Sequence, residues 1–67
     1  MHPGLEEIFR LREECDLEVE ADMKTELYRR VHLKLDEFLR QHRLTMTHAE
    51  FLSATGDDYR NWRRNPH

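Results

Sequence analysis

No glycine and no proline occurs between Leu5 and Thr55, and this absence constrains the fold more than any other feature of the sequence. Glycine and proline are the residues that most often interrupt helices. Because apolar residues recur every three or four positions along this stretch, the pattern indicates amphipathic helices and an all-α protein. Gly56 is the next glycine after Gly4. It is predicted to adopt a left-handed backbone conformation and to form a sharp turn.

A first helix is expected over residues 4–15, because Pro3 suits the start of a helix and Ile8 and Phe9 share one face. The segment 16–23 is ambiguous, since apolar and acidic residues alternate there as they do in a half-buried strand. A single strand would have no partner in this chain. We therefore expect this segment to be either helical or a loop.

The clearest helical periodicity lies in residues 23–43. Asp22 is expected to cap this central helix, which should end near His42. Since no helix breaker separates it from the first helix, one continuous helix from Leu5 to His42 is an alternative, and its exposed stripe would need a partner chain. The apolar stripe of the central helix consists of Leu27, Val31, Leu35, Phe38 and Leu39.

Two short helices are expected in the C-terminal third of the chain. Thr47 and Glu50 form a Thr-x-x-Glu capping box ahead of a helix over residues 48–55. After the glycine, Asp57 or Asp58 is expected to cap a last helix. The predicted fold is therefore a small three- or four-helix unit. The chain, residues 1–67, forms a single domain with an acidic N-terminal helix and possible loop (4–22), a central amphipathic helix (23–43) and a short helical pair (47–65).

A chain of 67 residues has a small core, because it buries only about 60% of the surface that its unfolded form exposes. Self-association adds burial, so we expect a protein partner, most simply a homodimer. The predicted interface lies on the first two helices. Its residues are Ile8, Phe9, Leu11, Val19, Met23, Leu27 and Val31.

The charge is unevenly distributed along the chain. The formal net charge is −3, but residues 1–26 carry nine acids against three bases, a balance of −6, and residues 27–67 carry eight bases against five acids, a balance of +3. Such asymmetry can orient a protein on a polyanion. It is equally consistent with two oppositely charged helices that pack against each other.

The stretch 27–65 resembles a repressor-type helix-turn-helix, with Thr47 capping a supporting helix, Gly56 in the turn and Trp62 at a buried position of the second helix. The resemblance implies a C-terminal pair that contacts DNA. In the alternative interpretation, Tyr59 and Trp62 close a helical core and the arginines form a solvated face. The residues that the resemblance places at DNA are Thr47, His48, Tyr59, Arg60, Asn61, Arg63 and Arg64.

No pattern in the sequence points to catalysis, a cofactor, a metal or a small-molecule substrate. His32 and Asp36 share a helix face, but the histidines are scattered and no phosphate-binding loop is present. Cys15, the single cysteine, is expected to be a small buried hydrophobe. No apolar run suits a signal peptide or a membrane span, so a cytoplasmic location is expected. We expect a small non-enzymatic regulatory or binding module that binds protein and possesses a DNA-contacting pair, or alternatively an adaptor or inhibitor without a nucleic-acid role.

Overall fold

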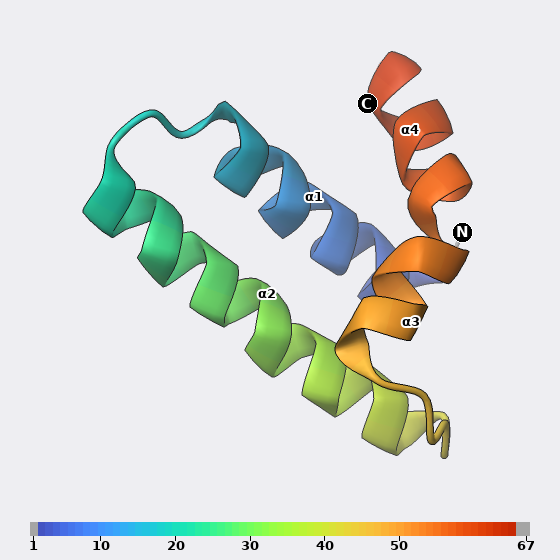
Figure 1. Cartoon of the computed structure of the whole chain (residues 1–67). Helices are drawn as coiled ribbons and strands as arrows, with labels where there is room; N and C mark the ends of the chain where they lie inside the picture. The colour runs from blue at the N-terminus through green and yellow to red at the C-terminus, as the bar shows by residue number, and fades with distance from the viewer. Residues whose placement is uncertain (1, 66–67) are drawn as a thin grey trace.

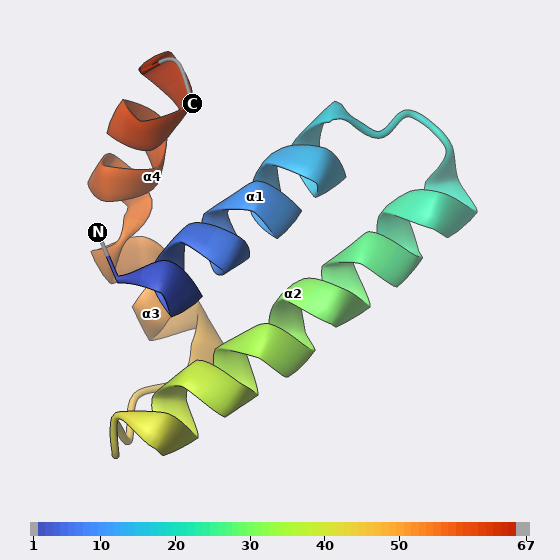
Figure 2. The ribbon, with the colours of Figure 1, turned by 180° about the vertical axis from the view of Figure 1, so that it is seen from behind.

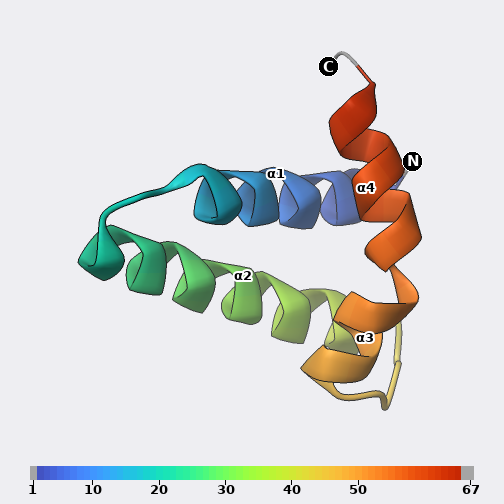
Figure 3. The same cartoon turned by 45° about the horizontal axis from the view of Figure 1, so that its top comes forward.

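A computed structural model describes residues 2–65, and within this range the chain forms helices and no strands, so the all-α expectation is confirmed. α1 and α2 lie side by side and run in opposite directions (Figure 1, Figure 2). α3 lies at the end of this pair that is opposite the α1–α2 linker, and α4 crosses α1 (Figure 3). The helices are α1 (Pro3–Leu17), α2 (Ala21–Gln41), α3 (His48–Ala54) and α4 (Gly56–Arg64).

The linker between α1 and α2 is short and is stabilised by one side chain. α1 continues to Leu17, and residues 18–20 are not helical. The carboxylate of Glu18 accepts hydrogen bonds of 3.0 Å from the backbone N–H groups of Val19 and Glu20. In this way two backbone N–H groups of the linker, which make no helical hydrogen bond, still have an acceptor. The alternative of one continuous helix is therefore wrong, and the ambiguous segment contains a loop.

The start of α2 differs from the sequence prediction. Glu20 occupies the N-cap position, and its side chain makes no capping hydrogen bond. Asp22, the predicted cap, lies inside the first turn of the helix. A carboxylate in that turn still stabilises the helix by its favourable interaction with the helix macrodipole.

α2 ends in a Schellman motif centred on Arg43, which has a φ of 55°. The N–H of Leu44 donates to the carbonyl of Leu39 at 2.8 Å, and the N–H of Arg43 donates to the carbonyl of Arg40 at 3.2 Å. These two bonds satisfy carbonyl groups at the helix end. Gly56 has no positive φ, so the prediction of a left-handed glycine is wrong. The residue with this conformation in the described chain is an arginine.

The core lies between α1, α2 and the two short helices. The apolar stripe of α2 packs inward as predicted, although Phe38 is only partly buried. Phe9 of α1 contributes the largest fully buried side chain. Cys15 and Leu27 are buried outside the main cluster. That cluster consists of Ile8, Phe9, Val31, Leu35, Leu39, Phe51, Tyr59 and Trp62.

The predicted capping box at the start of α3 is confirmed. The N–H of Glu50 donates to the hydroxyl of Thr47 at 3.1 Å, and the N–H of Thr47 donates to the carboxylate of Glu50 at 3.0 Å. Thr55 alone separates α3 from α4 and is the N-cap of α4. Asp57 and Asp58, the predicted caps, lie within the first turn of α4 instead. The chain changes direction between these two helices (Figure 3).

Candidate protein-binding surface

The end of the molecule that carries the α1–α2 linker exposes large apolar side chains. Val19 in the linker is 97% exposed, and Leu17 at the end of α1 is 65% exposed. Met23 and Tyr28 on α2 are also exposed. We call these four residues the open end, because α3 and α4 pack at the other end of the helix pair (Figure 1). Large exposed apolar side chains at one end of a small protein are candidates for an interaction surface.

A groove of about 180 Å³ adjoins the open end and lies between α1, α2 and α3. Tyr28 belongs to both the groove and the open end, which are therefore continuous. Cys15 in its wall is 5% exposed, and its thiol donates to the carbonyl of Lys24 at 3.6 Å. The expectation of a buried cysteine is confirmed. The groove is lined by Arg12, Cys15, Asp16, Lys24, Tyr28, Val31 and Leu52.

Arg12 is the most unusual residue of the groove. Its guanidinium carbon lies 4.0 Å from the ring centre of Tyr59, in a cation–π contact. Its Nη1 atom is buried and has no hydrogen-bond partner among the described residues. Burial lowers the pKa of the Arg12 guanidinium below its usual value, and the charge of Asp16 acts in the opposite direction. A buried cationic nitrogen without an acceptor is costly.

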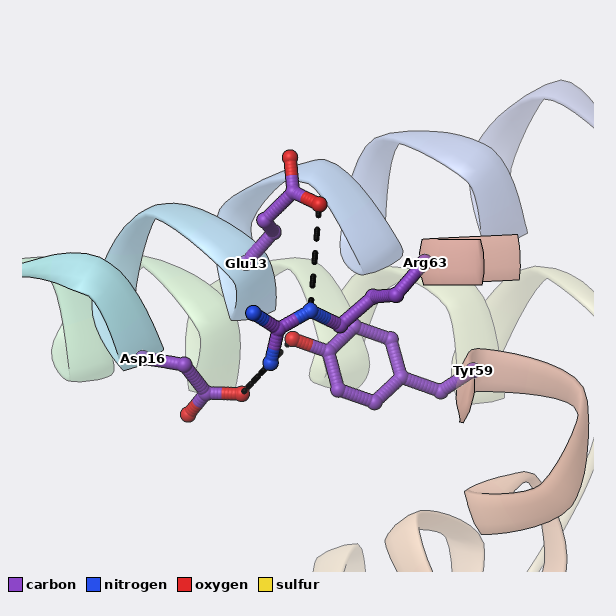
Figure 4. Close-up of polar contacts among 4 residues, drawn as sticks. All are labelled: Glu13, Asp16, Tyr59 and Arg63. Carbon is purple, nitrogen blue, oxygen red and sulfur yellow. Dashed lines mark hydrogen bonds and ion pairs between the residues drawn. The ribbon is translucent and has the colours of Figure 1, made fainter. Parts of the chain in front are cut away.

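Beside the groove, four polar residues attach α4 to α1 (Figure 4). The phenol of Tyr59 donates to Oδ2 of Asp16 at 2.7 Å. Arg63 lies between two carboxylates of α1, with Nη1 at 3.4 Å from Oδ2 of Asp16 and Nε at 3.8 Å from Oε2 of Glu13. Burial and the neighbouring carboxylate of Asp16 raise the pKa of Tyr59 above its usual value. The phenol therefore stays a hydrogen-bond donor in alkaline solution in which a free tyrosine side chain has ionised.

The unevenly distributed charges of the sequence form ion pairs between the helices. Acidic α1 pairs with α4 through Arg63, and it also pairs with α2, where Nζ of Lys34 lies 3.1 Å from Oε1 of Glu7. The hydrogen bond from Glu7 raises the pKa of Lys34. These ion pairs between helices agree with the interpretation that oppositely charged helices pack against each other.

The residues expected at DNA do not form one exposed surface. Tyr59 is 5% exposed, so the expectation that it contacts a DNA backbone is corrected. Arg63 is held by α1, and Arg60 is ion-paired with Asp57 on its own helix. Asn61 and Arg64 are exposed on α4. Trp62, placed at a buried position by the same resemblance, is 8% exposed, as expected.

The remaining two residues of that group contact other parts of the protein. The hydroxyl of Thr47 is engaged in the capping box of α3. His48 faces α2, where its Nδ1 lies 2.5 Å from Nδ1 of His32 and its Nε2 lies 2.5 Å from Oδ1 of Asp36. In residues 2–65 no group of three or more histidine, cysteine or acidic side chains is arranged to hold a metal ion. The His32–His48–Asp36 chain thus joins α3 to α2.

The predicted interface residues separate into three groups by burial. Those in the interior of the chain are corrected, because their side chains pack against its own helices; these are Ile8, Phe9, Leu27 and Val31. Leu11 is partly buried against the core. Val19 and Met23 are exposed at the open end, so these two predicted interface residues are accessible to a partner.

Leu17, Tyr28 and Arg12 were missed by the sequence reasoning. A signal for Tyr28 existed, because Lys24, Tyr28 and Val31 are spaced by four and three residues and share a helix face. Helical spacing also places Arg12 on the face of Ile8 and Phe9, which precede it by four and three residues, but it gives no sign of the contact with Tyr59. Its position depends on the stacking of Tyr59 from the far end of the chain.

The chain matches no protein-family model, and no curated protein or solved structure shows significant similarity to it. Among the described helices, none combines the length and the apolar character that crossing a membrane requires.

Proposed function

We propose that this protein is a small non-enzymatic binding module that self-associates through the open end of the α1–α2 pair. The observation that carries the proposal is the exposure of four large apolar side chains at that end, Leu17, Val19, Met23 and Tyr28. Their exposure is unfavourable in water, and a partner that covers them contributes about 1.5–3 kcal/mol for each large side chain buried.

The size of the chain supports the same proposal. The main core cluster contains no residue of the linker or of the first turn of α2. Domains of this length have little stability to spare, and association adds apolar burial. A homodimer is the simplest form, since two copies can bury the same surface on both sides of a two-fold axis.

The proposal is tested by Val19→Asp combined with Met23→Asp. Both side chains are exposed, so the monomer should keep its helicity and its melting temperature. Loss of two buried apolar side chains should weaken the dimer by more than about a hundredfold. Light scattering coupled to gel filtration measures this change.

Leu33→Asp is the matched control. Leu33 is 60% exposed on α2 but lies ten residues, about 15 Å, beyond Met23 along the helix. This variant should self-associate like the wild type. Equal weakening by Leu33→Asp and by the double variant would contradict an interface at the open end.

DNA binding through α4 is a second proposal. Arg60, Asn61 and Arg64 share one exposed face of the helix, as residues spaced by three and four do. It has less support, because Asp57 lies on the same face, is ion-paired with Arg60 and repels phosphate. The test is retention on duplex DNA at low salt, which Arg60→Ala with Arg64→Ala should abolish. Absence of retention by the wild type removes the proposal.

A further inference from the structure

The groove beside the open end has an unbalanced positive charge. Arg12 and Lys24 both line it, and no carboxylate of the described residues is ion-paired with Arg12. Asp16 also lines the groove, but its carboxylate already accepts from Tyr59 and pairs with Arg63. The groove is therefore complementary to a segment that combines apolar side chains with a carboxylate that has no partner of its own.

The α1–α2 linker of the same chain has this composition. Leu17 and Val19 are exposed apolar residues, and Glu20 follows them directly. The carboxylate of Glu18 is engaged with the backbone of the linker. The carboxylate of Glu20, by contrast, forms no hydrogen bond or ion pair with any residue in the range 2–65, and it does not cap α2.

The spacing of these features suits a two-fold arrangement. Arg12 precedes Leu17 by five residues on α1, about 7.5 Å along the helix axis. Cys15 and Asp16 line the groove and directly precede Leu17, so the linker adjoins the groove. When two copies meet there around a two-fold axis, the linker of each copy faces the groove of the other, and the same contact forms twice.

We infer that each protomer of the dimer inserts its Leu17–Glu20 linker into the groove of its partner, with the carboxylate of Glu20 accepting hydrogen bonds from the guanidinium of Arg12. The inference rests on the proposed self-association and specifies its contact. It gives the guanidinium of Arg12, which lines the groove, a carboxylate acceptor, and a charged acceptor forms the stronger type of hydrogen bond. Arg12 then acts as the residue that determines which partner surface fits.

A charge exchange between the two residues tests the inference. Glu20→Arg, at an exposed position, should keep the monomer fold and weaken the dimer by about tenfold or more, because two cations then meet in the groove. Arg12→Glu should weaken it similarly. An equimolar mixture of the two variants should form a heterodimer, detected by mass spectrometry under native conditions. Glu14→Arg, an exposed charge reversal elsewhere on α1, is the control and should leave dimerisation unchanged.

Arg12 stacks on Tyr59, so Arg12→Glu can also disturb the monomer. A second pair, Arg12→Gln and Glu20→Gln, avoids a reversed charge, and the effect of Glu20→Gln on the dimer should disappear when Arg12→Gln is present. If the wild type is a dimer and Glu20→Arg and Glu20→Gln leave its dissociation constant unchanged, the inference is overturned and the proposed function survives. A wild type that is monomeric at all concentrations overturns both.

Discussion

The phenol of Tyr59 on α4 donates a 2.7 Å hydrogen bond to Oδ2 of Asp16 on α1, and this bond joins the last helix to the first. Arg63 contacts the same carboxylate oxygen at 3.4 Å. The ring of Tyr59 lies under the guanidinium of Arg12 and packs in the core with Phe9. One buried tyrosine therefore links the core, the groove and the packing of α4.

Tyr59→Phe should destabilise the protein by about 1 kcal/mol, because it removes the hydrogen bond and retains the ring. The value is below the about 1.5–3 kcal/mol that is usual for a charged acceptor, because the side chain of Asp16 is 50% exposed and partly solvated. Urea unfolding measures the change. Tyr28→Phe is the control, because Tyr28 is 53% exposed, and it should cost nothing measurable. Equal effects of the two substitutions would contradict a specific role for the Tyr59–Asp16 bond.

The raised pKa of Tyr59 predicts a loss of stability in alkali. Burial and then Asp16 favour the neutral phenol in the folded state. A group whose pKa is higher in the folded than in the unfolded chain contributes stability below its unfolded value, about 10 for tyrosine, and loses it as the pH rises further. Between pH 9 and about 12, the wild type should therefore lose more stability than Tyr59→Phe. Parallel pH profiles of the two proteins would refute this explanation.

The helices themselves could be predicted because their signals are local. The capping box of Thr47 and Glu50 and the α2 stripe of Leu27, Val31 and Leu35 depend on residues within a few positions of one another. Helical periodicity also indicated which side of α2 is buried. These features therefore appear in the structure at the residues where the sequence placed them.

The turns and the surface could not be predicted, because they depend on contacts between distant residues. Arg43 adopts a left-handed conformation that is commoner for glycine, and the sequence carries no sign of it. Gly56 does not mark a left-handed turn, because a glycine also fits the first turn of a helix. Which apolar residues stay exposed depends on where α3 and α4 pack. Val19 and Val31 were both predicted as interface residues, but Val19 is exposed and Val31 is buried.

Arg43→Gly should stabilise the protein by about 0.5–1 kcal/mol. A residue with a Cβ atom in the left-handed conformation is strained by about 1–2 kcal/mol, and the larger chain entropy of unfolded glycine offsets part of the gain. Thermal unfolding by circular dichroism measures the shift. Arg43→Ala controls for loss of the side chain and should bring no gain, because alanine keeps the Cβ atom. A glycine variant that is less stable than the alanine variant would exclude strain at this position.

Acid should weaken the start of α3 through Glu50. Hydrogen bonds from the backbone and hydroxyl of Thr47 lower the pKa of Glu50 in the folded protein. A group with a depressed folded pKa contributes stability above its unfolded value, about 4.3 for glutamate, and loses that contribution as the pH falls. From pH 6 to about 3, the melting temperature should therefore fall more for the wild type than for Glu50→Gln.

Glu14→Gln is the matched control for this acid dependence. Glu14 is exposed on α1, away from the capping box, and its replacement should leave the acid profile like that of the wild type. If Glu14→Gln flattens the profile as much as Glu50→Gln does, the acid sensitivity is a general charge effect and the explanation through the capping box fails.

Sedimentation equilibrium of the unmodified protein tests the self-association of the open end most directly. Its apparent mass should rise with concentration from the 8.3 kDa of the single chain toward twice that value. The rise should also be lost when Val19 and Met23 are both replaced by aspartate. A mass that stays at 8.3 kDa up to a concentration of about 1 mM, where even weak dimers are populated, would contradict the account.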